Sequence, residues 1–264
     1  MTAQALHADP ATGLGTLYLV PAPLDFGCDA HQNPLAKSMP LATLERAATL
    51  RHWVCENAKS TLAYLKRIGE MYPLCVPIQA MHLHELPREV HKKGDHHGGF
   101  DAQHLLAAAL QGEHIGLVSE SGMPAIADPG SSVVRCAHAL GLRVVPLVGP
   151  VSLMLALASS GLNGQNFAFV GYLPSTPAER TTKIRELEAH ALKTGQTQLF
   201  IETPYRNVAM LQTLLQCLQK NTRLATASGL TLDHEACHSA LVKDWKHASW
   251  SVDNKTPTVF AIGR

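Results

Sequence analysis

Short apolar runs alternate with amphipathic segments along the first part of this 264-residue chain, and this alternation constrains the fold more than any other feature. Residues 16–20, 52–55 and 115–118 are rich in β-branched or aromatic residues, as buried strands are. Segments between them, such as 58–68, carry apolar residues at helical spacing. This order indicates an α/β fold with a mostly parallel sheet and helices on both faces.

A glycine-bearing loop follows one of these strands, in the stretch 117–130, LVSESGMPAIADPG. Gly122 allows backbone groups to approach a ligand, and two prolines restrict the loop. An ordinary βα connection is the alternative for this stretch alone. Turns of similar composition follow two other predicted strands, at 21–23 and 148–150. Because ligands bind outside the carboxyl ends of parallel strands, we expect the three turns to converge on one crevice.

The composition predicts a globular protein, with 46% hydrophobic and 16% charged residues. A formal charge of +1 indicates no global attraction to nucleic acid, although a local basic patch remains open. The six cysteines form no CxxC pair, so we expect reduced thiols in a cytoplasmic protein. We expect no secretory signal at the amino terminus.

Residues 144–162 are uncharged and long enough to cross a bilayer. The prolines, glycines and serines in this stretch favour a strand, a turn and a buried helix instead.

Two domains are expected, with the boundary where the pattern changes after 161. Residues 1–14 are predicted to be disordered or loosely packed, 15–162 form the amino-terminal α/β domain, and 163–264 form a carboxy-terminal α/β domain with a mixed sheet. In the first domain, 77–83 is the expected third strand and 85–99 a mobile surface loop.

Histidines are frequent around the third predicted strand, and an HxH spacing can occur in metal sites. No cysteine or well-placed carboxylate completes a set there, so no metal site is predicted and a solvated loop is favoured. The histidines concerned are His82, His84, His91, His96 and His97.

The chain resembles the tetrapyrrole-methylase class of S-adenosylmethionine (SAM) dependent methyltransferases over almost its whole length. GTLYLVPAPLDF at 15–26 resembles the family's GTLYLVATPIGN, and VSESGMPAIADPG at 118–130 resembles VSDAGTPLISDPG. VPLVGPVSLMLALASSGL at 145–162 resembles the family's proline-glycine turn and helix. GYLP, LFIETPYR and LTLDHE, which begin at 171, 199 and 230, resemble GFLP, LIFYESPHR and LTKLHE.

The resemblance implies that SAM binds in a cleft between the two α/β domains. Backbone hydrogen-bonding edges and an apolar wall suit its adenine, its methionine end and its sulfonium better than a row of lysines does. The matched cofactor-binding positions are Pro23, Ser121, Gly122, Met123, Ile126, Val151, Ser152, Glu202, Leu230 and Thr258. Each of them also has a structural interpretation as a packing or turn residue.

The departures from the family lie on the substrate side. Asp25-Phe26 replaces a glycine-asparagine pair, so an altered floor of the substrate cleft is expected. The family's AEDTRHT becomes CENAKST, in which Glu56 is retained and Lys59 replaces an arginine. Lysine keeps the charge but loses the planar fork that binds phosphate bidentately.

Methyl transfer from a sulfonium is an in-line displacement, and a nearby base helps to deprotonate a hydroxyl acceptor. The candidate catalytic residues are Glu56 and His82, with His84 also open. Lys59 and Arg206 are the candidate substrate-binding residues.

By resemblance, the acceptor is a ribose 2′-hydroxyl in small-subunit ribosomal RNA, and the enzyme is a homodimer without a membrane partner. Two alternatives stay open, because RNA binding rests on phosphate neutralisation and the charged motif is diluted here. One is SAM-dependent methylation of a tetrapyrrole or another non-RNA acceptor, and the other is a catalytically inactive SAM-binding relative.

Overall fold

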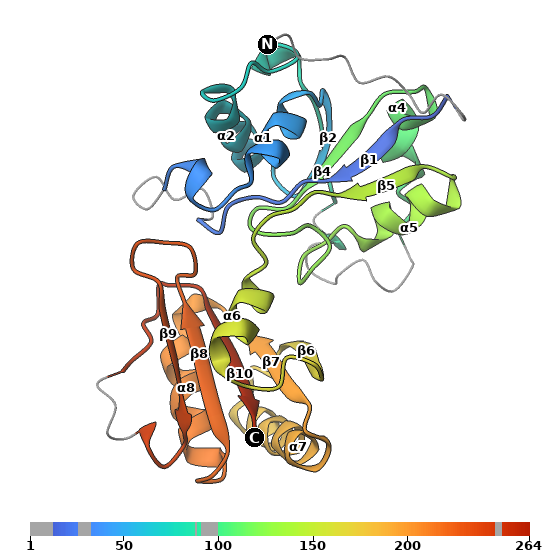
Figure 1. Ribbon diagram of the computed structural model, residues 1–264. Coiled ribbons are helices and arrows are strands. Elements are labelled where there is room, and N and C mark those ends of the chain that lie inside the picture. Colours follow the sequence, from blue (N-terminus) through green and yellow to red (C-terminus); the bar gives the residue numbers. More distant parts are fainter. Residues whose placement is uncertain (1–12, 26–32, 88, 91–99, 246–249) are drawn as a thin grey trace. The chain divides into compact units, whose positions relative to one another are not determined.

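In a computed structural model (Figure 1), the protein consists of two compact units, Met1–Pro150 and Val151–Arg264. The structure describes residues 13–25, 33–87, 89–90, 100–245 and 250–264. The division falls after Pro150, before the sequence-based boundary at 162. The reason is that helix α6, Ser152–Ser160, packs against strands of the second unit.

The first unit contains a five-stranded sheet in the order β3-β2-β4-β1-β5, and all its strand pairs are parallel. The strands are β1 (Thr16–Leu19), β2 (His52–Cys55), β3 (His82–Glu85), β4 (Ile115–Val118) and β5 (Arg143–Pro146). The helices are η2 (Leu35–Lys37), α1 (Leu41–Ala48), α2 (Ala58–Gly69), η3 (Ile78–Ala80), η4 (Gln103–Leu106), α4 (Ala107–Leu110) and α5 (Ser131–Ala139).

Alternate strand residues of the first unit enter two separate cores, as a sheet covered on both faces requires. Trp53 and Tyr18 pack with α1 and α2 on one face. Leu17 and Val54, which neighbour them in sequence, pack with α4 and α5 on the other face. The predicted architecture of this unit is therefore confirmed.

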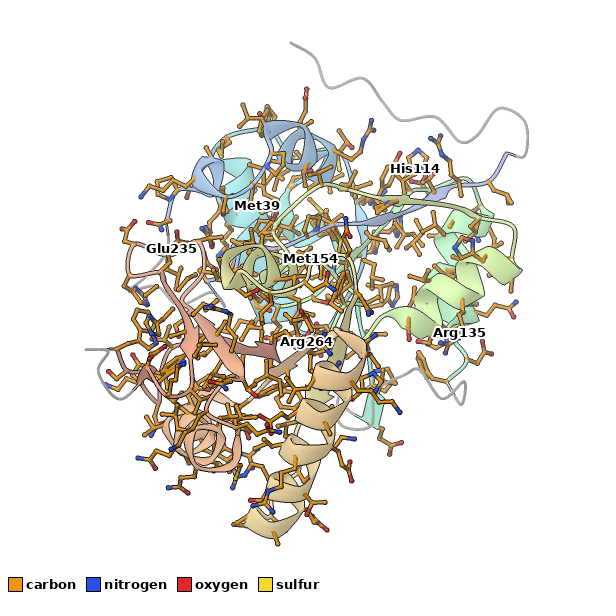
Figure 2. The ribbon with its side chains drawn as sticks, turned by 60° about the horizontal axis from the view of Figure 1, so that its bottom comes forward. Met39, His114, Arg135, Met154, Glu235 and Arg264 are labelled. Carbon is orange, nitrogen blue, oxygen red and sulfur yellow. The ribbon has the colours of Figure 1, made fainter. Side chains whose placement is uncertain are left out.

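The buried start of β1 is fixed by a histidine. His114, labelled in Figure 2, accepts a hydrogen bond from the backbone N–H of Thr16 through Nδ1 at 3.0 Å. Its ring also lies edge-on to Tyr18, with a centroid separation of 5.6 Å.

The second unit contains a mixed sheet in the order β6-β7-β10-β8-β9, in which β6 and β7 are parallel and the other neighbours antiparallel. Its strands are β6 (Phe167–Tyr172), β7 (Thr197–Ile201), β8 (Arg223–Ser228), β9 (Ala236–Leu241) and β10 (Thr258–Gly263). Its helices are α6, α7 (Pro177–Thr194), η5 (Pro204–Arg206) and α8 (Asn207–Cys217). The mixed sheet of the second domain is thus confirmed.

Helices α7 and α8 supply Ile184 and Met210 to a core that includes the stacked rings of Phe200 and Phe260. Helix α6 lies against β8, β9 and β10, and Ser239 Oγ donates a hydrogen bond to Ser160 O at 2.5 Å. This contact ties α6 to the second unit.

One predicted strand was wrong in position. Residues 77–83 were expected to form the third strand, but Ile78–Ala80 is a 3₁₀ turn and β3 begins at His82. Pro77 starts this turn, since its fixed φ suits the first residue of a helical turn better than a ladder position. The expected loop at 85–99 lies mostly outside the described residues, as does the predicted amino-terminal segment up to residue 12.

Residues 144–162 contain β5, a turn and α6, as expected in place of a membrane span. Across the described ranges, no helix combines the length and the apolar character needed to cross a bilayer.

We predict that Gly116→Ala destabilises the first unit. A Cβ atom at Gly116 would lie 2.6 Å from two ring carbons of the fully buried Trp53, in the centre of the sheet. Such overpacking costs about 1–3 kcal/mol, measurable by urea unfolding. Gly164→Ala is the matched control, because a Cβ there meets nothing within 4 Å. Equal stability of the two variants would contradict the prediction.

Candidate active site

The three glycine and proline turns of the first unit meet at the carboxyl edge of its sheet. The turn after β1 pairs with the loop after β4 through two backbone hydrogen bonds, Ala22 N–H to Gly122 O at 2.9 Å and Gly122 N–H to Ala22 O at 3.0 Å. The turn after β5 packs on the first, since a Cβ on Gly149 would lie 2.2 Å from Pro21 Cγ. The three turns therefore meet, as predicted, but among them only the first two line the pocket described next.

The loop after β4 is held in a backbone conformation of high energy. Gly122 has φ +73°, and Ala125 and Ala127 have φ +64° and +65°. Alanine in this left-handed region costs about 1–2 kcal/mol. Such strain persists where surrounding contacts impose it, and it clusters at ligand-binding sites.

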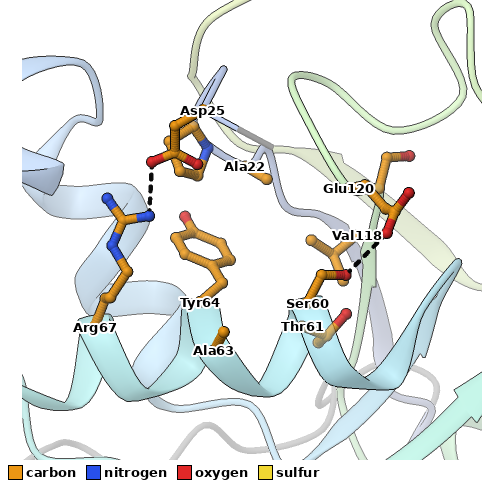
Figure 3. A pocket seen from close by; sticks show the side chains of 11 residues that line it. Ala22, Asp25, Ser60, Thr61, Ala63, Tyr64, Arg67, Val118 and Glu120 are labelled. Carbon is orange, nitrogen blue, oxygen red and sulfur yellow. Dashed lines mark hydrogen bonds and ion pairs between the residues drawn. The ribbon is translucent and has the colours of Figure 1, made fainter. Parts of the chain in front are cut away.

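A small pocket, partly open to solvent, lies beside these turns and against α2 (Figure 3). Ala22 and Pro23 line it from the first turn, and Ser119 and Glu120 from the loop after β4. The remaining lining residues are Asp25, Ser60, Thr61, Ala63, Tyr64, Arg67 and Val118. Hydroxyl groups and charges of both signs therefore face one hollow.

An ion pair forms one wall of the pocket (Figure 3). Arg67 on α2 donates to Asp25 Oδ2 at 2.7 Å and to Asn33 O at 2.9 Å. Asp25 is one of the positions at which the chain departs from the family pattern, and the pair gives it a partner on α2. Beside it, the hydroxyl of Tyr64 donates to Pro21 O at 3.0 Å, and burial raises the pKa of this phenol.

Two buried serine hydroxyls at this edge have no hydrogen-bond partner among the described residues. They are Ser119 Oγ and Ser121 Oγ, on either side of Glu120. Ser119 is 4% exposed. A buried hydroxyl that stays unpaired costs about 1–3 kcal/mol, so these groups point to a polar ligand.

Carboxylates gather at the same edge. Glu56 follows β2, and its Oε1 lies 3.4 Å from the backbone N of Glu120, which follows β4. Glu85 ends β3 and accepts a hydrogen bond from Ala58 N–H at 2.6 Å. Desolvation by burial, together with the charges of Glu56 and Glu120, raises the pKa of Asp128 to about 7.

Cys55, at the end of β2, does not supply a reactive thiolate at this edge. Burial raises the pKa of its thiol to about 11, so the neutral form dominates at pH 7. Acid–base chemistry here therefore rests on carboxylates. Among the described residues, no group of three or more His, Cys, Asp or Glu side chains is arranged to hold a metal ion.

The structure brings Glu56 to this edge but not His82. His82 is the first residue of β3 and stacks on His52, the first residue of β2, at a centroid separation of 4.8 Å. Both rings therefore lie at the amino ends of parallel strands, opposite the turns. His84 is also within β3, and His91, His96 and His97 lie outside the described residues.

Lys59 is exposed in the first turn of α2. The neighbouring Asn57 caps this helix, and its Oδ1 accepts hydrogen bonds from Lys59 N–H at 2.9 Å and Ser60 N–H at 3.3 Å. Asparagine caps a helix as well as aspartate does. The departure from the family at Asn57 therefore preserves the helix start.

The proposed cofactor positions of the first unit fall on the meeting turns. Pro23 is buried in the turn after β1, and Ser121, Gly122 and Met123 lie in the loop after β4. Ile126, farther along this loop, is 43% exposed. Val151 and Ser152, assigned to the first domain from sequence, are the cap and first residue of α6 and belong to the second unit.

In the second unit, Glu202 and Arg206 form an ion pair at the end of β7. The side chain of Glu202 is fully buried, and Arg206 Nη2 lies 2.8 Å from Glu202 Oε1. Thr203 N–H donates to the same oxygen at 2.7 Å. No partner for Glu202 Oε2 exists in the described part of the chain.

The other two proposed positions of this unit are also buried. Thr258 Oγ1 lies 2.8 Å from Ser228 Oγ and accepts from Asn207 Nδ2 at 3.2 Å. Leu230 is 9% exposed and precedes Thr231, a β-branched residue with φ +70°. A second strained loop therefore adjoins a proposed position.

Sequence reasoning missed Ser119, Glu120 and Asp128 as functional candidates. A signal for Glu120 was present, because it directly follows a predicted buried strand. The raised pKa of Asp128 had no such signal, since it depends on burial and on Glu56, which is 72 positions away.

Comparison with known proteins identifies the class of enzyme. The sequence model of the family described as Tetrapyrrole (Corrin/Porphyrin) Methylases matches residues 41–245. The chain belongs to this family and is a SAM-dependent methyltransferase.

Relatives named ribosomal RNA small subunit methyltransferase I align along much of the chain. The protein of Escherichia coli O157:H7 is 30% identical over 236 residues, which cover 89% of this chain and 72% of the relative. That of Pseudomonas aeruginosa is 29% identical over 88% of this chain and 73% of the relative. That of Vibrio cholerae is 37% identical over 53% and 48%, respectively.

Solved structures share the fold. The methyltransferase CobJ has a TM-score of 0.55 and 18% identity, over 95% of this chain and 94% of its own. Native uroporphyrin III C-methyltransferase from Thermus thermophilus has a TM-score of 0.52 and 15% identity, over 95% and 98%.

We predict that Asp128→Asn raises stability more at pH 8 than at pH 4. The raised pKa means that Asp128 favours folding while protonated, and this contribution is lost as pH rises from about 4 through about 7. The stability gain of the variant should grow by on the order of 4 kcal/mol over this range. Urea unfolding at both pH values measures it, with the exposed Asp101→Asn as control. A pH-independent difference would contradict the prediction.

Proposed function

We propose that the chain binds SAM at the meeting turns of the first unit and methylates a ribose 2′-hydroxyl in small-subunit ribosomal RNA. The observation that carries the proposal is the Ala22–Gly122 backbone pair beside the buried hydroxyls of Ser119 and Ser121. The names of the aligned relatives support the acceptor.

The residues at this edge fit SAM. Gly122 has no side chain to block a ligand at the backbone, and the serine hydroxyls can donate to or accept from its polar groups. The carboxylates Glu56, Glu120 and Asp128 provide negative charge near a cationic cofactor. SAM supplies an electrophilic methyl group on a sulfonium. We propose Pro23, Ser121, Gly122, Met123 and Ile126 as its contacts in this unit.

In the second unit, we propose Val151, Ser152, Glu202, Leu230 and Thr258 as cofactor-binding positions. The unpartnered oxygen of Glu202 supports its inclusion, because a buried carboxylate oxygen requires a donor. Arg206, 30% exposed, is proposed to combine a positioning role for Glu202 with contact to substrate.

The acceptor is proposed to enter the pocket beside α2. Ser60, Thr61 and Glu120 offer hydroxyl and carboxylate groups for a sugar, and exposed Lys59 is proposed to contact a backbone phosphate. Glu56 is proposed to take part in acid–base catalysis. Its location at the end of β2 supports it over His82, which stacks on His52 at the opposite edge.

A non-RNA acceptor, such as a tetrapyrrole, is a second candidate. The specific observation that favours an acceptor without anionic groups over RNA is the acidic edge, because carboxylates at Glu56, Glu85, Glu120 and Asp128 repel phosphates. A SAM-binding relative without catalytic activity is the third candidate.

We also propose that the enzyme acts as a homodimer in the cytoplasm. Light scattering tests the oligomeric state, and cell fractionation tests the location.

Calorimetric titration with SAM, followed by labelled-methyl transfer to 30S subunits from a strain that lacks the modification, separates these functions. Binding with transfer supports the first. Binding with transfer only to a tetrapyrrole panel supports the second, and binding without any transfer supports the third. Failure to bind SAM would overturn all of them.

We predict that Gly122→Ala weakens SAM binding at least tenfold. The added Cβ would lie 3.3 Å from Leu24 Cδ2 at φ +73°, so the paired turns must shift. Gly141→Ala is the control, with φ +72° and no atom within 4 Å of the Cβ. Both variants should lose about 1 kcal/mol of stability, but the control should bind SAM as the wild type does. Equal affinities in a calorimetric titration would refute this assignment.

We predict that Glu56→Gln lowers the single-turnover rate of methyl transfer at least tenfold at pH 7, because the amide cannot take part in proton transfer. Quenched-flow measurement with the true acceptor provides the rate, and SAM affinity checks that the site remains intact. Full retention of the rate would show that Glu56 has no catalytic part.

A further inference from the structure

The ion pair between Asp25 and Arg67 forms a wall of the pocket but has no role in the proposed function. Arg67 Nη1 lies 2.7 Å from Asp25 Oδ2, and the side chains of Arg67 and Asp25 are 15% and 5% exposed. Both residues line the pocket, which Arg67 reaches from α2 (Figure 3). At the position of Asp25 the family pattern has a glycine. A charged pair therefore occupies a place where the family pattern supplies no side chain.

The guanidinium of Arg67 is engaged at both terminal nitrogens. Nη1 donates to Asp25 Oδ2 at 2.7 Å, and Nη2 donates to Asn33 O at 2.9 Å. Arginine holds a phosphate through a planar fork of parallel N–H groups. A phosphate that enters the pocket therefore has to compete with a protein carboxylate and a protein carbonyl for this fork.

The charged side chains that line the pocket have a negative sum. Among the described lining residues they are Asp25, Arg67 and Glu120, with formal charges of −1, +1 and −1. Asp25 and Arg67 are largely buried, and salt screens buried charges less than exposed ones. A phosphate or carboxylate inside the pocket meets a net charge of −1 and is repelled, whereas an uncharged group is not.

The uncharged lining groups suit a ligand that carries hydroxyl groups. Ser119 is 4% exposed, and its Oγ has no partner in the described part of the chain. Because polar groups are rarely buried without a partner, a polar ligand atom is expected beside it. On the α2 side, Ser60 Oγ lies 3.3 Å from Glu120 Oε1. The hydroxyl of Tyr64 donates to Pro21 O, and its oxygen can still accept a hydrogen bond.

We propose, on the basis of the proposed function, that Asp25 is a specificity-determining residue for the acceptor. By neutralising Arg67, it makes the pocket select an uncharged, hydroxyl-bearing part of the acceptor, the ribose, and exclude the attached phosphates. A phosphate then stays outside the pocket, near Lys59, which is exposed in the first turn of the same helix. A glycine in place of Asp25 would leave Arg67 without this carboxylate and would open the pocket to anions.

The test compares two probes that share a sugar and differ in charge, methyl ribofuranoside and ribose 5-phosphate. Each is titrated at low salt into isotope-labelled protein, both alone and saturated with S-adenosylhomocysteine, the demethylated product of SAM. The backbone amide NMR signals of Ser60, Thr61 and Glu120 report binding in the pocket. The wild type should bind the riboside about tenfold tighter than the phosphate.

Asp25→Asn should abolish this preference. The amide keeps the size of the side chain and an acceptor oxygen for Arg67, but it leaves the positive charge of Arg67 uncompensated. Ribose 5-phosphate should therefore bind about tenfold tighter to the variant than to the wild type, and the riboside should change by less than about threefold. Adding Arg67→Gln to Asp25→Asn should remove the gain. Glu186→Gln is the matched control, because it breaks the exposed Lys183–Glu186 pair on α7.

The outcomes separate this assignment from the proposed function. If neither SAM nor S-adenosylhomocysteine binds, the proposed function fails, and titrations of the protein alone decide the selectivity of the pocket. The role of Asp25 is overturned if the wild type binds ribose 5-phosphate as tightly as the riboside, or binds neither.

It is also overturned if Asp25→Asn gains no affinity for the phosphate while its circular dichroism matches that of the wild type. Asp25→Ser, a smaller replacement that also removes the charge, takes its place where the circular dichroism differs. A gain in the Asp25 variant that is absent from the double variant and from Glu186→Gln supports the assignment.

Discussion

The two hydrogen bonds between Ala22 and Gly122 are the interaction on which the candidate site depends. They join loops that follow adjacent parallel strands, β1 and β4, and they require backbone polar groups to meet without an intervening side chain. The turn after β5 contacts the turn after β1, because Gly149 packs closely on Pro21. The parallel sheet therefore aligns the strand ends, and small residues allow the turns to touch.

This arrangement explains why polar chemistry gathers at one edge. Two of the strand ends add polar or charged residues directly after a buried run: Glu56 follows β2, and Ser119 and Glu120 follow β4. The opposite edge carries the stacked His52 and His82. The edge that carries the carboxylates adjoins the strained loop and the pocket.

Much of this could be predicted from the sequence, because it rests on local patterns. Short apolar runs predicted nearly every strand, and apolar residues at helical spacing predicted the helices between them. The glycine and proline turns predicted the loops that meet. The start of β3 could not be found, because His82 and its neighbours carry no alternation that marks the boundary after Pro77. Because β3 begins at His82 and not at residue 77, this histidine lies at the amino edge of the sheet. The role of Asn57 as a helix cap could not be predicted without the exact start of α2. The raised pKa of Asp128 could not be predicted either, because it depends on burial and on charges that are distant in sequence.

The central claim is that the joined turns of the first unit form the SAM site. A crystal structure of the chain with S-adenosylhomocysteine tests it most directly. The account predicts that the nucleoside contacts the backbone at Gly122 and that the hydroxyl of Ser119 or Ser121 hydrogen-bonds to it or to a water it holds. A nucleoside bound away from this loop, with both hydroxyls paired to protein groups, would contradict it.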